Sequence, residues 1–360
     1  MITIRPEASD DYREILRLTY EAFLTLDYPG RQRMDEHFLI HLLRGSQSVI
    51  RELSFVAEMG GKIVGHILYT PSKVLQADGK EIDTITFGPL SVLPEYHRQG
   101  VGRLLVRHSM DKARELGFSA VLITGVPEYY PRLGFKRARE YGLMLEDGAA
   151  FDAFMAYELR PGYLSGGGTV RFLPGEFVQC ETDEAGYERF HKAWMAECFP
   201  GQVTLRTFWE QDVALVKRWL AMPHVAKWYE HPNDWLCELE NRHGEFAFIT
   251  HCIAEFEGNP IGFCQYYDCF AAQKYEAWNE TWRVDIRPGV TFSIDYLIGE
   301  PEYLRKGYGR EMVRLLTEKV RKRGGTRILV QPDKGNTPSG RALEANDYRM
   351  IDGEYVKDLT

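Results

Sequence analysis

Two short stretches, one in each half of the chain, decide how this sequence folds. The first is His-Arg-Gln-Gly-Val-Gly at residues 97–102, and the second is Leu-Arg-Lys-Gly-Tyr-Gly at residues 304–309. Glycines at a strand-to-helix turn let backbone N–H groups approach an anion, and the helix N-terminus adds partial positive charge. One such loop alone can be a plain tight turn. Two loops at equivalent places in a repeated pattern predict two diphosphate sites.

The segments around each loop repeat as well. Apolar runs at residues 85–92 and 292–298 predict a strand before each loop, and apolar residues at helical spacing predict a long helix after it. Each half also opens with a short strand, at residues 2–5 and 203–206, followed by an acid-led amphipathic helix and two strand-like runs around a tight turn. The chain is therefore expected to contain the same fold twice.

Length and composition agree with two domains. The chain has 360 residues, 44% of them hydrophobic and 27% charged, which is the range of globular proteins. We predict an N-terminal domain over residues 1–178, a connecting segment over 179–201 and a C-terminal domain over 202–360. The stretch from about 161 to 201, which leads into and includes this segment, carries Pro-Gly and Gly-rich turns, but its aromatic residues predict that it packs against something.

Several classes of function are disfavoured. A net charge of −8 argues against a nucleic-acid partner, and no apolar stretch reaches the ~18–20 residues that span a bilayer. The N-terminus does not resemble a signal peptide, and the six cysteines form no CxxC pair, so we expect no metal site and a cytoplasmic protein with reduced cysteines.

The loops are not nucleotide-binding motifs of the common kinds. The third glycine of G-x-G-x-x-G is replaced by Leu105 and Met312, and no G-K-[ST] follows either loop. The remaining pattern resembles the Q/R-x-x-G-x-G/A loop of the GNAT N-acyltransferase superfamily, although the first position is His97 in one loop and Leu304 in the other. The resemblance implies an α/β fold class: two tandem GNAT-like domains, each with a mixed, largely antiparallel central sheet flanked by helices. It implies acetyl-CoA as the co-substrate of each domain.

The resemblance also implies which residues hold acetyl-CoA. Backbone amides of each loop are expected to bind the diphosphate, and the strand before the loop is expected to bind the pantetheine arm. In the N-terminal domain these residues are Leu90, Ser91, Val92, Arg98, Gln99, Gly100, Val101, Gly102 and Arg103. In the C-terminal domain they are Leu297, Ile298, Arg305, Lys306, Gly307, Tyr308, Gly309, Arg310 and Asn336.

In the N-terminal domain, Tyr130 is the candidate proton donor. It lies four residues before the Gly-Phe pair of residues 134–135, where the superfamily has the tyrosine that protonates the departing CoA thiolate. A phenol of pKa about 10 can donate to a thiolate whose thiol has a pKa of about 8.5. The alternative is a tyrosine that only packs. Glu95 is a candidate base, although an exposed acid without a catalytic role also fits its position.

The C-terminal half resembles aminoglycoside 6′-N-acetyltransferases. The resemblance runs through residues 203–206, 260–266, 294–299 and 331–336. It implies that Asp295 contacts the amine that is acetylated, with a structural carboxylate as the alternative. The family places a tyrosine seven residues after Asn336, but this chain has Leu343 there. The usual proton donor of this half is therefore missing.

These expectations combine into direct transfer of an acetyl group from acetyl-CoA to a primary amine of a small cationic molecule, without a covalent enzyme intermediate. Aromatic residues interspersed with acids before the second loop suit a cationic ligand, or equally a core beside a solvated acidic loop. The alternatives are an acyl-CoA-binding sensor or scaffold and a protein amine acetyltransferase. The oligomeric state, monomer or homodimer, stays open.

Overall fold

The computed structural model describes residues 2–24, 26, 31–172, 174–229, 231–273 and 286–359. Its contacts divide the chain into two compact units. Unit 1 comprises Met1–Leu24 and Met34–Phe190, and unit 2 comprises Thr25–Arg33 and His191–Thr360. The division at Phe190 falls inside the segment 179–201 that was expected to connect two domains.

Unit 1 is built on a mixed sheet with the strand order β1-β2-β3-β4-β5-β8-β6, extended by β7 and β9. Its strands are β1 (Ile2–Pro6), β2 (Phe55–Met59), β3 (Lys62–Leu75), β4 (Glu81–Val92), β5 (Ala120–Thr124), β6 (Lys136–Arg137), β7 (Leu143–Leu145), β8 (Phe154–Glu158) and β9 (Gly168–Phe172). Most neighbours pair antiparallel, and β4 with β5 and β7 with β9 pair parallel.

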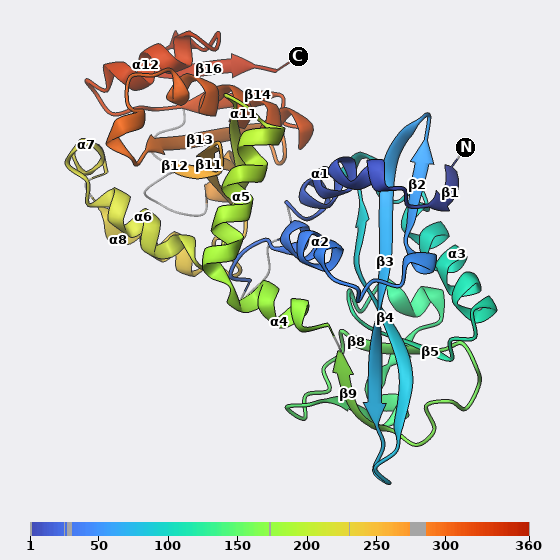
Figure 1. The fold of residues 1–360 in the computed structure, drawn as a ribbon. Coiled ribbons are helices and arrows are strands. Elements are labelled where there is room, and N and C mark those ends of the chain that lie inside the picture. The colour runs from blue at the N-terminus through green and yellow to red at the C-terminus, as the bar shows by residue number, and fades with distance from the viewer. Residues whose placement is uncertain are drawn as a thin grey trace. The chain divides into compact units, whose positions relative to one another are not determined.

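Helices lie on both faces of this sheet. Those that pack on it are α1 (Tyr12–Phe23) and α3 (Val101–Glu115). The helix α2 (Glu36–Gly45) packs against α1, α4 (Gly175–Thr182) packs against α2, and α5 (Glu184–Cys198) begins in unit 1 and ends in unit 2. Figure 1 shows α1 and α2 on one side of β3 and β4, and α3 on the other side. The α3 helix buries Val101, Leu105, Val106 and Met110 against the sheet, because apolar residues at this spacing share one helical face.

Unit 2 repeats this plan with the strand order β10-β11-β12-β13-β14-β16-β15. Its strands are β10 (Val203–Thr207), β11 (Ile249–Phe256), β12 (Asn259–Asp268), β13 (Thr291–Ile298), β14 (Arg327–Val330), β15 (Arg349–Ile351) and β16 (Glu354–Asp358). Its helices are α6 (Asp212–Leu220), α7 (Pro223–Ala226), α8 (Pro232–Glu240), α9 (Cys269–Ala272), α11 (Tyr308–Lys322) and α12 (Thr337–Glu344).

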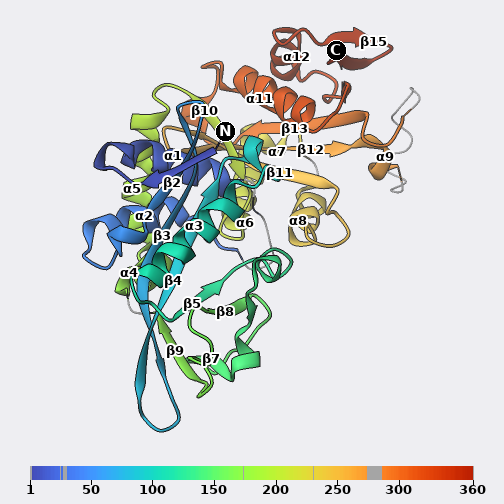
Figure 2. The same cartoon turned by 90° about the vertical axis from the view of Figure 1, so that its right-hand side faces the viewer.

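The second sheet is likewise covered on both faces. In Figures 1 and 2, α11 and α12 lie on one side of β11–β13, and α6 and α8 lie on the other. Among its paired strands only β13 and β14 run parallel in the described part of the chain. Both sheets are thus mixed and largely antiparallel, which confirms the predicted fold class.

Candidate functional site

The first glycine loop has the backbone of an anion cradle. It connects a short turn at Pro94–Tyr96 to α3, and Arg98 and Gly100 adopt positive φ angles of 61° and 87°. The first amide of α3 that bonds back to the loop is that of Leu104, which donates to the Gly100 carbonyl at 3.0 Å. The N–H groups of residues 101–103 therefore point out of the helix end, where a diphosphate can accept them.

The second loop has the same conformation. It follows a turn at Pro301–Tyr303, Arg305 and Gly307 have φ angles of 60° and 89°, and the Glu311 amide donates to the Gly307 carbonyl at 3.2 Å. Both turns are Pro-Glu-Tyr, so the sequence repeat extends upstream of the two glycine loops. A side-chain carbon at Gly309 would meet nothing closer than 3.9 Å, so the space above the helix end is open.

The strand before each loop separates from its neighbour near the predicted acyl site. Within the described residues, β4 pairs with β5 only at Ile85 and Thr86, and β13 pairs with β14 only at residues 291–293. Backbone groups on this edge of residues 90–92 and 297–298 are therefore free of a strand partner there. The other edge stays paired, for example Leu90 with Ile67 and Leu297 with Phe263. Such an open edge can take a pantetheine amide.

Tyr130 lies in the apolar core at the end of this gap. Its ring contacts Phe87, Phe135 and Tyr129, with ring centres 5.0–5.8 Å away, and only 8% of the residue is exposed. Burial and the neighbouring Tyr129 raise the pKa of Tyr130 well above its usual value. The phenol therefore holds its proton at neutral pH, as a proton donor must.

Tyr129 is a further residue at this site that sequence reasoning missed. A side-chain carbon at Gly102 would lie 2.8 Å from the Tyr129 hydroxyl, so this hydroxyl sits against the first turn of α3. The residue is partly buried, and burial raises its pKa. The adjacent pair of tyrosines in the sequence is a signal that could have led to it.

Leu343 occupies the place in unit 2 that Tyr130 occupies in unit 1. The Phe135 amide donates to the Tyr130 carbonyl at 3.3 Å, and the Tyr348 amide donates to the Leu343 carbonyl at 3.2 Å. In both turns the residue before the donor has a positive φ. Leu343 is completely buried in the core of unit 2 and offers no proton.

A polar cavity of about 650 Å³ lies in unit 2 between α8, β12, β13 and the segment after β14. Most of the charged side chains on its wall are acidic, and aromatic side chains lie among them. Both kinds of group favour a cationic ligand. Its lining includes the acids Asp295, Glu238 and Asp333, the amide of Gln265, and the indole rings of Trp228 and Trp235.

Asp295 projects into this cavity from β13. Gln265, directly opposite on β12, donates its amide N–H to the Asp295 carboxylate at 3.1 Å. Burial raises the pKa of Asp295 to about 6, against the opposing effect of the Gln265 hydrogen bond. The structure therefore places the predicted amine-contacting acid on the wall of a cavity, where burial makes its carboxylate easier to protonate than an exposed one.

Several other residues predicted from the sequence make structural contacts, as helix caps or in a surface ion pair. Asn336 lines the same cavity, and its side chain also accepts the Ser339 amide as the cap of α12. Of the aromatic and acidic residues noted in the sequence, Asp268 caps α9, while Glu276, Trp278, Glu280, Trp282 and Asp285 lie outside the described residues. In unit 1, Glu95 forms an exposed ion pair with Lys62 at 3.1 Å. This pairing fits the interpretation as a surface acid.

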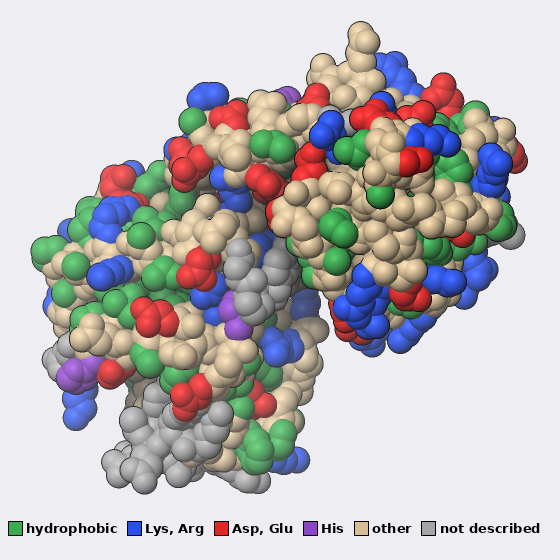
Figure 3. All heavy atoms as spheres, turned by 90° about the horizontal axis from the view of Figure 1, so that it is seen from below, with side chains coloured by type: hydrophobic (Ala, Val, Ile, Leu, Met, Phe, Trp, Pro, Cys, Tyr) green, Lys and Arg blue, Asp and Glu red, His purple; other side chains and the backbone are tan. Residues whose placement is uncertain are grey.

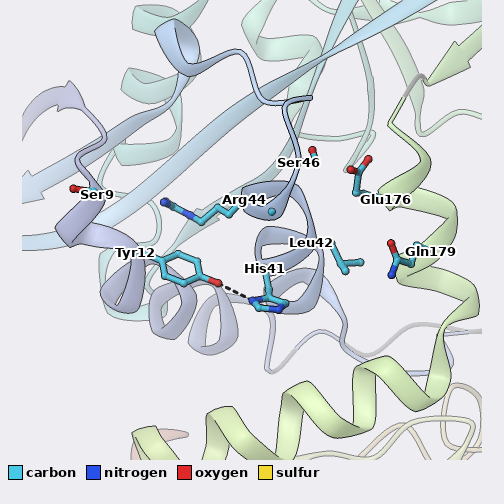
Figure 4. Close-up of a pocket in the computed structure, with 9 residues that line it drawn as sticks. Ser9, Tyr12, His41, Leu42, Arg44, Ser46, Glu176 and Gln179 are labelled. Atoms are coloured by element: carbon cyan, nitrogen blue, oxygen red, sulfur yellow. Dashed lines mark hydrogen bonds between the residues drawn. The ribbon is translucent and has the colours of Figure 1, made fainter.

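Unit 1 carries a separate cavity of about 540 Å³ beside α1, α2 and α4 (Figure 4). The Tyr12 hydroxyl and His41 share a hydrogen bond of 2.9 Å on its floor, with Arg44 beside them and Glu176 and Gln179 across it. None of the residues predicted for acyl transfer lines this cavity.

Comparisons with known proteins match one acetyltransferase family model to each half of the chain, and each matched segment contains one of the two glycine loops. An acetyltransferase (GNAT) family model matches residues 11–135, and an acetyltransferase (GNAT) domain model matches residues 209–352. The aminoglycoside N(6′)-acetyltransferase type 1 of Klebsiella pneumoniae is 30% identical over 149 residues, which are 39% of this chain and 71% of that protein. The chain belongs to the GNAT acetyltransferase family. The two matched segments confirm the predicted pair of GNAT domains.

This GNAT chain spans less than two thirds of the length of the curated relative YhbS that it matches. The uncharacterized N-acetyltransferase YhbS of Escherichia coli K12 is 30% identical over 106 residues, which are 29% of this chain and 62% of YhbS. The crystal structure of E. coli YhbS in complex with CoA has 27% identity and a TM-score of 0.42, covering 49% of this chain and 92% of that one. The crystal structure of aminoglycoside acetyltransferase AAC(6′)-Ib with coenzyme A and kanamycin has 26% identity and a TM-score of 0.38. The match covers 44% of this chain and 95% of that one.

On the face that Figure 3 shows, Lys and Arg side chains are interspersed with Asp and Glu over much of the surface. In the described part of the chain, no helix is long and apolar enough to cross a bilayer. No group of three or more metal-ligating side chains gathers among the described residues.

Proposed function

We propose that this chain transfers an acetyl group from acetyl-CoA directly to a primary amine of a small cationic molecule. The observation that carries the proposal is the identical backbone of the two loops, each opening a helix with free N–H groups. The open edges of β4 and β13 continue each cradle toward the place where a thioester would lie. This repeated geometry fits two acyl-CoA sites, in which the amides of residues 101–103 and 308–310 hold the diphosphate.

The proposed chemistry is aminolysis of a thioester. The neutral amine attacks the acetyl carbon, the C–S bond breaks, the departing thiolate takes a proton, and the attacking nitrogen gives up one of its N–H protons as the amide forms. In unit 1 we assign that proton to Tyr130, whose burial keeps it protonated. In unit 2 we assign the acceptor contact to Asp295. Because an alkyl ammonium has a pKa of about 10.4 and cannot attack, the site must also remove one proton from the acceptor.

The proposed acceptor is an amine-bearing cation, similar in kind to an aminoglycoside or a polyamine. The support is the acidic cavity of unit 2, together with the relative of K. pneumoniae, whose name states that it acetylates the 6′ position of aminoglycosides. A second candidate for unit 2 is binding without turnover. Leu343 favours it, because this buried side chain stands where unit 1 has Tyr130.

Charge reversal at one helix end at a time tests the two acyl-CoA sites. Arg103 and Arg310 are exposed, and each occupies the third position of its helix, α3 or α11. Arg103→Glu or Arg310→Glu places a carboxylate beside one diphosphate site, and should weaken CoA binding there by about tenfold or more. An acid in the first turn favours the helix, so folding should survive.

Calorimetric titration of the full chain with CoA measures the outcome. We expect two CoA molecules per wild-type chain, one strong site in each single variant, and none in the double variant. Each variant is the matched control for the other. A wild-type chain that binds no CoA would overturn the proposal, and binding lost through only one of the two substitutions would reduce the other loop to a plain turn.

A further inference from the structure

One position on the strand before each glycine loop carries a different kind of side chain in the two units. On β4, Leu90 lies opposite Ile67 of β3. On β13, Tyr296 lies opposite Cys264 of β12. Ile67 and Cys264 are each the sixth residue of their strand, so the two pairs occupy the same place in their hairpins. Leu90 and Tyr296 each pack against the core beneath the helix that follows the loop, and Tyr296 is therefore the counterpart of Leu90.

A second position in the same cores shows the opposite exchange. The turn that carries Tyr130 in unit 1 carries Leu343 in unit 2, as the matching backbone hydrogen bonds show. Unit 1 thus has its leucine on the strand and its tyrosine on the turn, whereas unit 2 has its tyrosine on the strand and its leucine on the turn. The same two positions are filled by the same two residue types in reversed order.

The Tyr296 hydroxyl reaches across the gap beside β13. It lies 2.8 Å from the Ser339 hydroxyl and donates to the Ser339 carbonyl at 3.2 Å. Ser339 belongs to α12 and lies about one helical turn before Leu343. Within the described residues β13 and β14 pair only at residues 291–293, so this phenol crosses the opening proposed for the pantetheine arm. A thioester held in that opening would lie against the phenol.

The surroundings of Tyr296 keep its proton in place. Burial raises the pKa of Tyr296 to about 12. The hydrogen bond with Ser339 opposes this rise, and the neighbouring Tyr355 and Asp295 add to it. Since burial disfavours the charged phenolate, the hydroxyl is protonated at neutral pH. The side chain that crosses the gap is therefore able to donate.

We propose that Tyr296 donates the proton to the CoA thiolate in unit 2, where the turn carries Leu343 and cannot donate. As the amine attacks and the C–S bond breaks, the sulfur takes the phenolic proton, which gives the free thiol of CoA and a tyrosinate. The tyrosinate regains a proton through the Ser339 hydroxyl, which lines the cavity, and the proton that the attacking nitrogen loses balances the reaction. This inference rests on the proposed function, because it names the proton donor of that reaction.

Neighbouring residues of β13 then serve the two ends of the reaction. Side chains alternate between the faces of a strand, so Asp295 and Tyr296 point to opposite sides of the sheet. Asp295 lies against Gln265 on the cavity side, whereas Tyr296 packs against the core beneath α11. Contact with the amine and delivery of a proton to the sulfur are thereby assigned to separate side chains on either side of the open strand edge.

Turnover by unit 2 provides the test, in the full chain with Arg103→Glu to silence the site of unit 1. Tyr296→Phe removes only the hydroxyl that crosses the gap. Tyr348→Phe is the matched control, because it removes a hydroxyl from another buried tyrosine of the same core, one that is bonded to Thr317 on α11. Phe135 occupies the corresponding position in unit 1, so a phenylalanine suits this position.

Two reactions are measured. One is acetyl transfer from acetyl-CoA to spermidine or kanamycin, and the other is hydrolysis of acetyl-CoA, which needs the same proton on the sulfur and no amine. We expect Tyr296→Phe to lower kcat of both reactions at least about tenfold, while the KM for acetyl-CoA changes by less than about twofold. Tyr348→Phe should leave both constants within about twofold of the parent chain.

Exchanging the two side chains separates proton donation from a structural role. Tyr296→Leu combined with Leu343→Tyr gives unit 2 the arrangement of unit 1, and should recover most of the turnover that Tyr296→Leu alone loses. A merely structural role predicts no recovery, because the hydrogen bond to Ser339 stays broken in the exchanged chain. This comparison does not use Tyr296→Phe, so it tests the proposal even if that variant folds poorly.

Three results would contradict the inference. The first is unchanged kcat in a Tyr296→Phe chain that still binds CoA. The second is tighter CoA binding by Tyr296→Phe without loss of turnover, which would make the phenol an obstruction in the gap. The third is absence of transfer and hydrolysis by a unit 2 that binds CoA, which would leave the acyl-CoA sites standing. Loss of CoA binding by the Arg103→Glu chain would instead contradict the proposed function.

Discussion

Tyr130 and Leu343 occupy the same turn in the two units and differ in whether the side chain can donate a proton. Tyr130→Phe removes one hydroxyl from a packed ring, so the fold and CoA affinity should persist while acetyl transfer by unit 1 falls at least about tenfold. Leu343→Tyr should raise transfer by unit 2, provided the core absorbs the larger side chain, which typically costs about 1–3 kcal/mol.

The measurement is CoA release with a panel of amines. Arg310→Glu isolates unit 1 for the Tyr130→Phe comparison, and Arg103→Glu isolates unit 2 for Leu343→Tyr. Fast turnover by unit 2 with Leu343 unchanged would show that another group donates the proton there. Unchanged turnover after Tyr130→Phe would remove Tyr130 from the mechanism.

At the scale of elements, an arginine on the first strand of each unit forms ion pairs with two acids, one at the start of the following helix and one on the neighbouring strand. In unit 1, Arg5 bonds to Asp11 and Glu58 at 2.7 Å each, and its side chain is 33% exposed. In unit 2, Arg206 bonds to Asp212 and Glu255 at 2.6 and 2.7 Å, and its side chain is 4% exposed. The ion pairs of Arg5 are therefore partly exposed to water, whereas those of Arg206 are buried in the core of unit 2.

Burial predicts different costs for the same substitution in the two trios. Glu255→Gln leaves Arg206 buried without its second acid and should cost unit 2 about 3–5 kcal/mol of unfolding free energy. Glu58→Gln should cost unit 1 only about 0–1 kcal/mol, because water screens its partner. All seven tryptophans lie in unit 2, so their fluorescence follows the unfolding of that unit, while circular dichroism follows both.

The loss of unfolding free energy that Glu255→Gln causes in unit 2 should become smaller at acid pH. Burial alone would raise the pKa of Glu255, but the charges of Arg206 and His191 lower this pKa to about 2. The pKa of a glutamate in an unfolded chain is about 4.3. The carboxylate's contribution is complete above pH ~4.3 and is lost as the pH falls toward 2. A difference between wild type and Glu255→Gln that persists unchanged at pH 2 would contradict this account.

At the scale of the whole molecule, two acyl-CoA sites would link CoA to the stability of both units. A ligand that binds only the folded state stabilises it, by about 2.7 kcal/mol at a hundredfold excess over its Kd. CoA should therefore shift the fluorescence transition of unit 2 and the remaining circular-dichroism transition of unit 1. In Arg103→Glu only the fluorescence transition should respond. A response confined to one unit in the wild type would mean that the other binds no CoA.

The sequence by itself determined the two-unit plan and the two glycine loops. The positive φ angles at Gly100 and Gly307, the helix ends that follow them and the apolar stripe of α3 all depend on residues close together in the chain. Local patterns of glycine and apolar spacing are therefore sufficient to predict them. The position of Leu343 was identified from the family resemblance, and the structure shows the same backbone hydrogen bond at its turn and at the turn of Tyr130.

Only the tertiary structure decided the acidic cavity of unit 2. Asp295 was predicted from a resemblance, but Glu238 lies on a helix with no motif, and Gln265 belongs to a strand whose pattern indicates burial alone. Their meeting depends on how α8 packs across β12 and β13, and the raised pKa values of Glu238 and Asp295 depend on the burial of both carboxyl groups. Side-chain proximity and desolvation are properties of the packed chain, so no local pattern contains them.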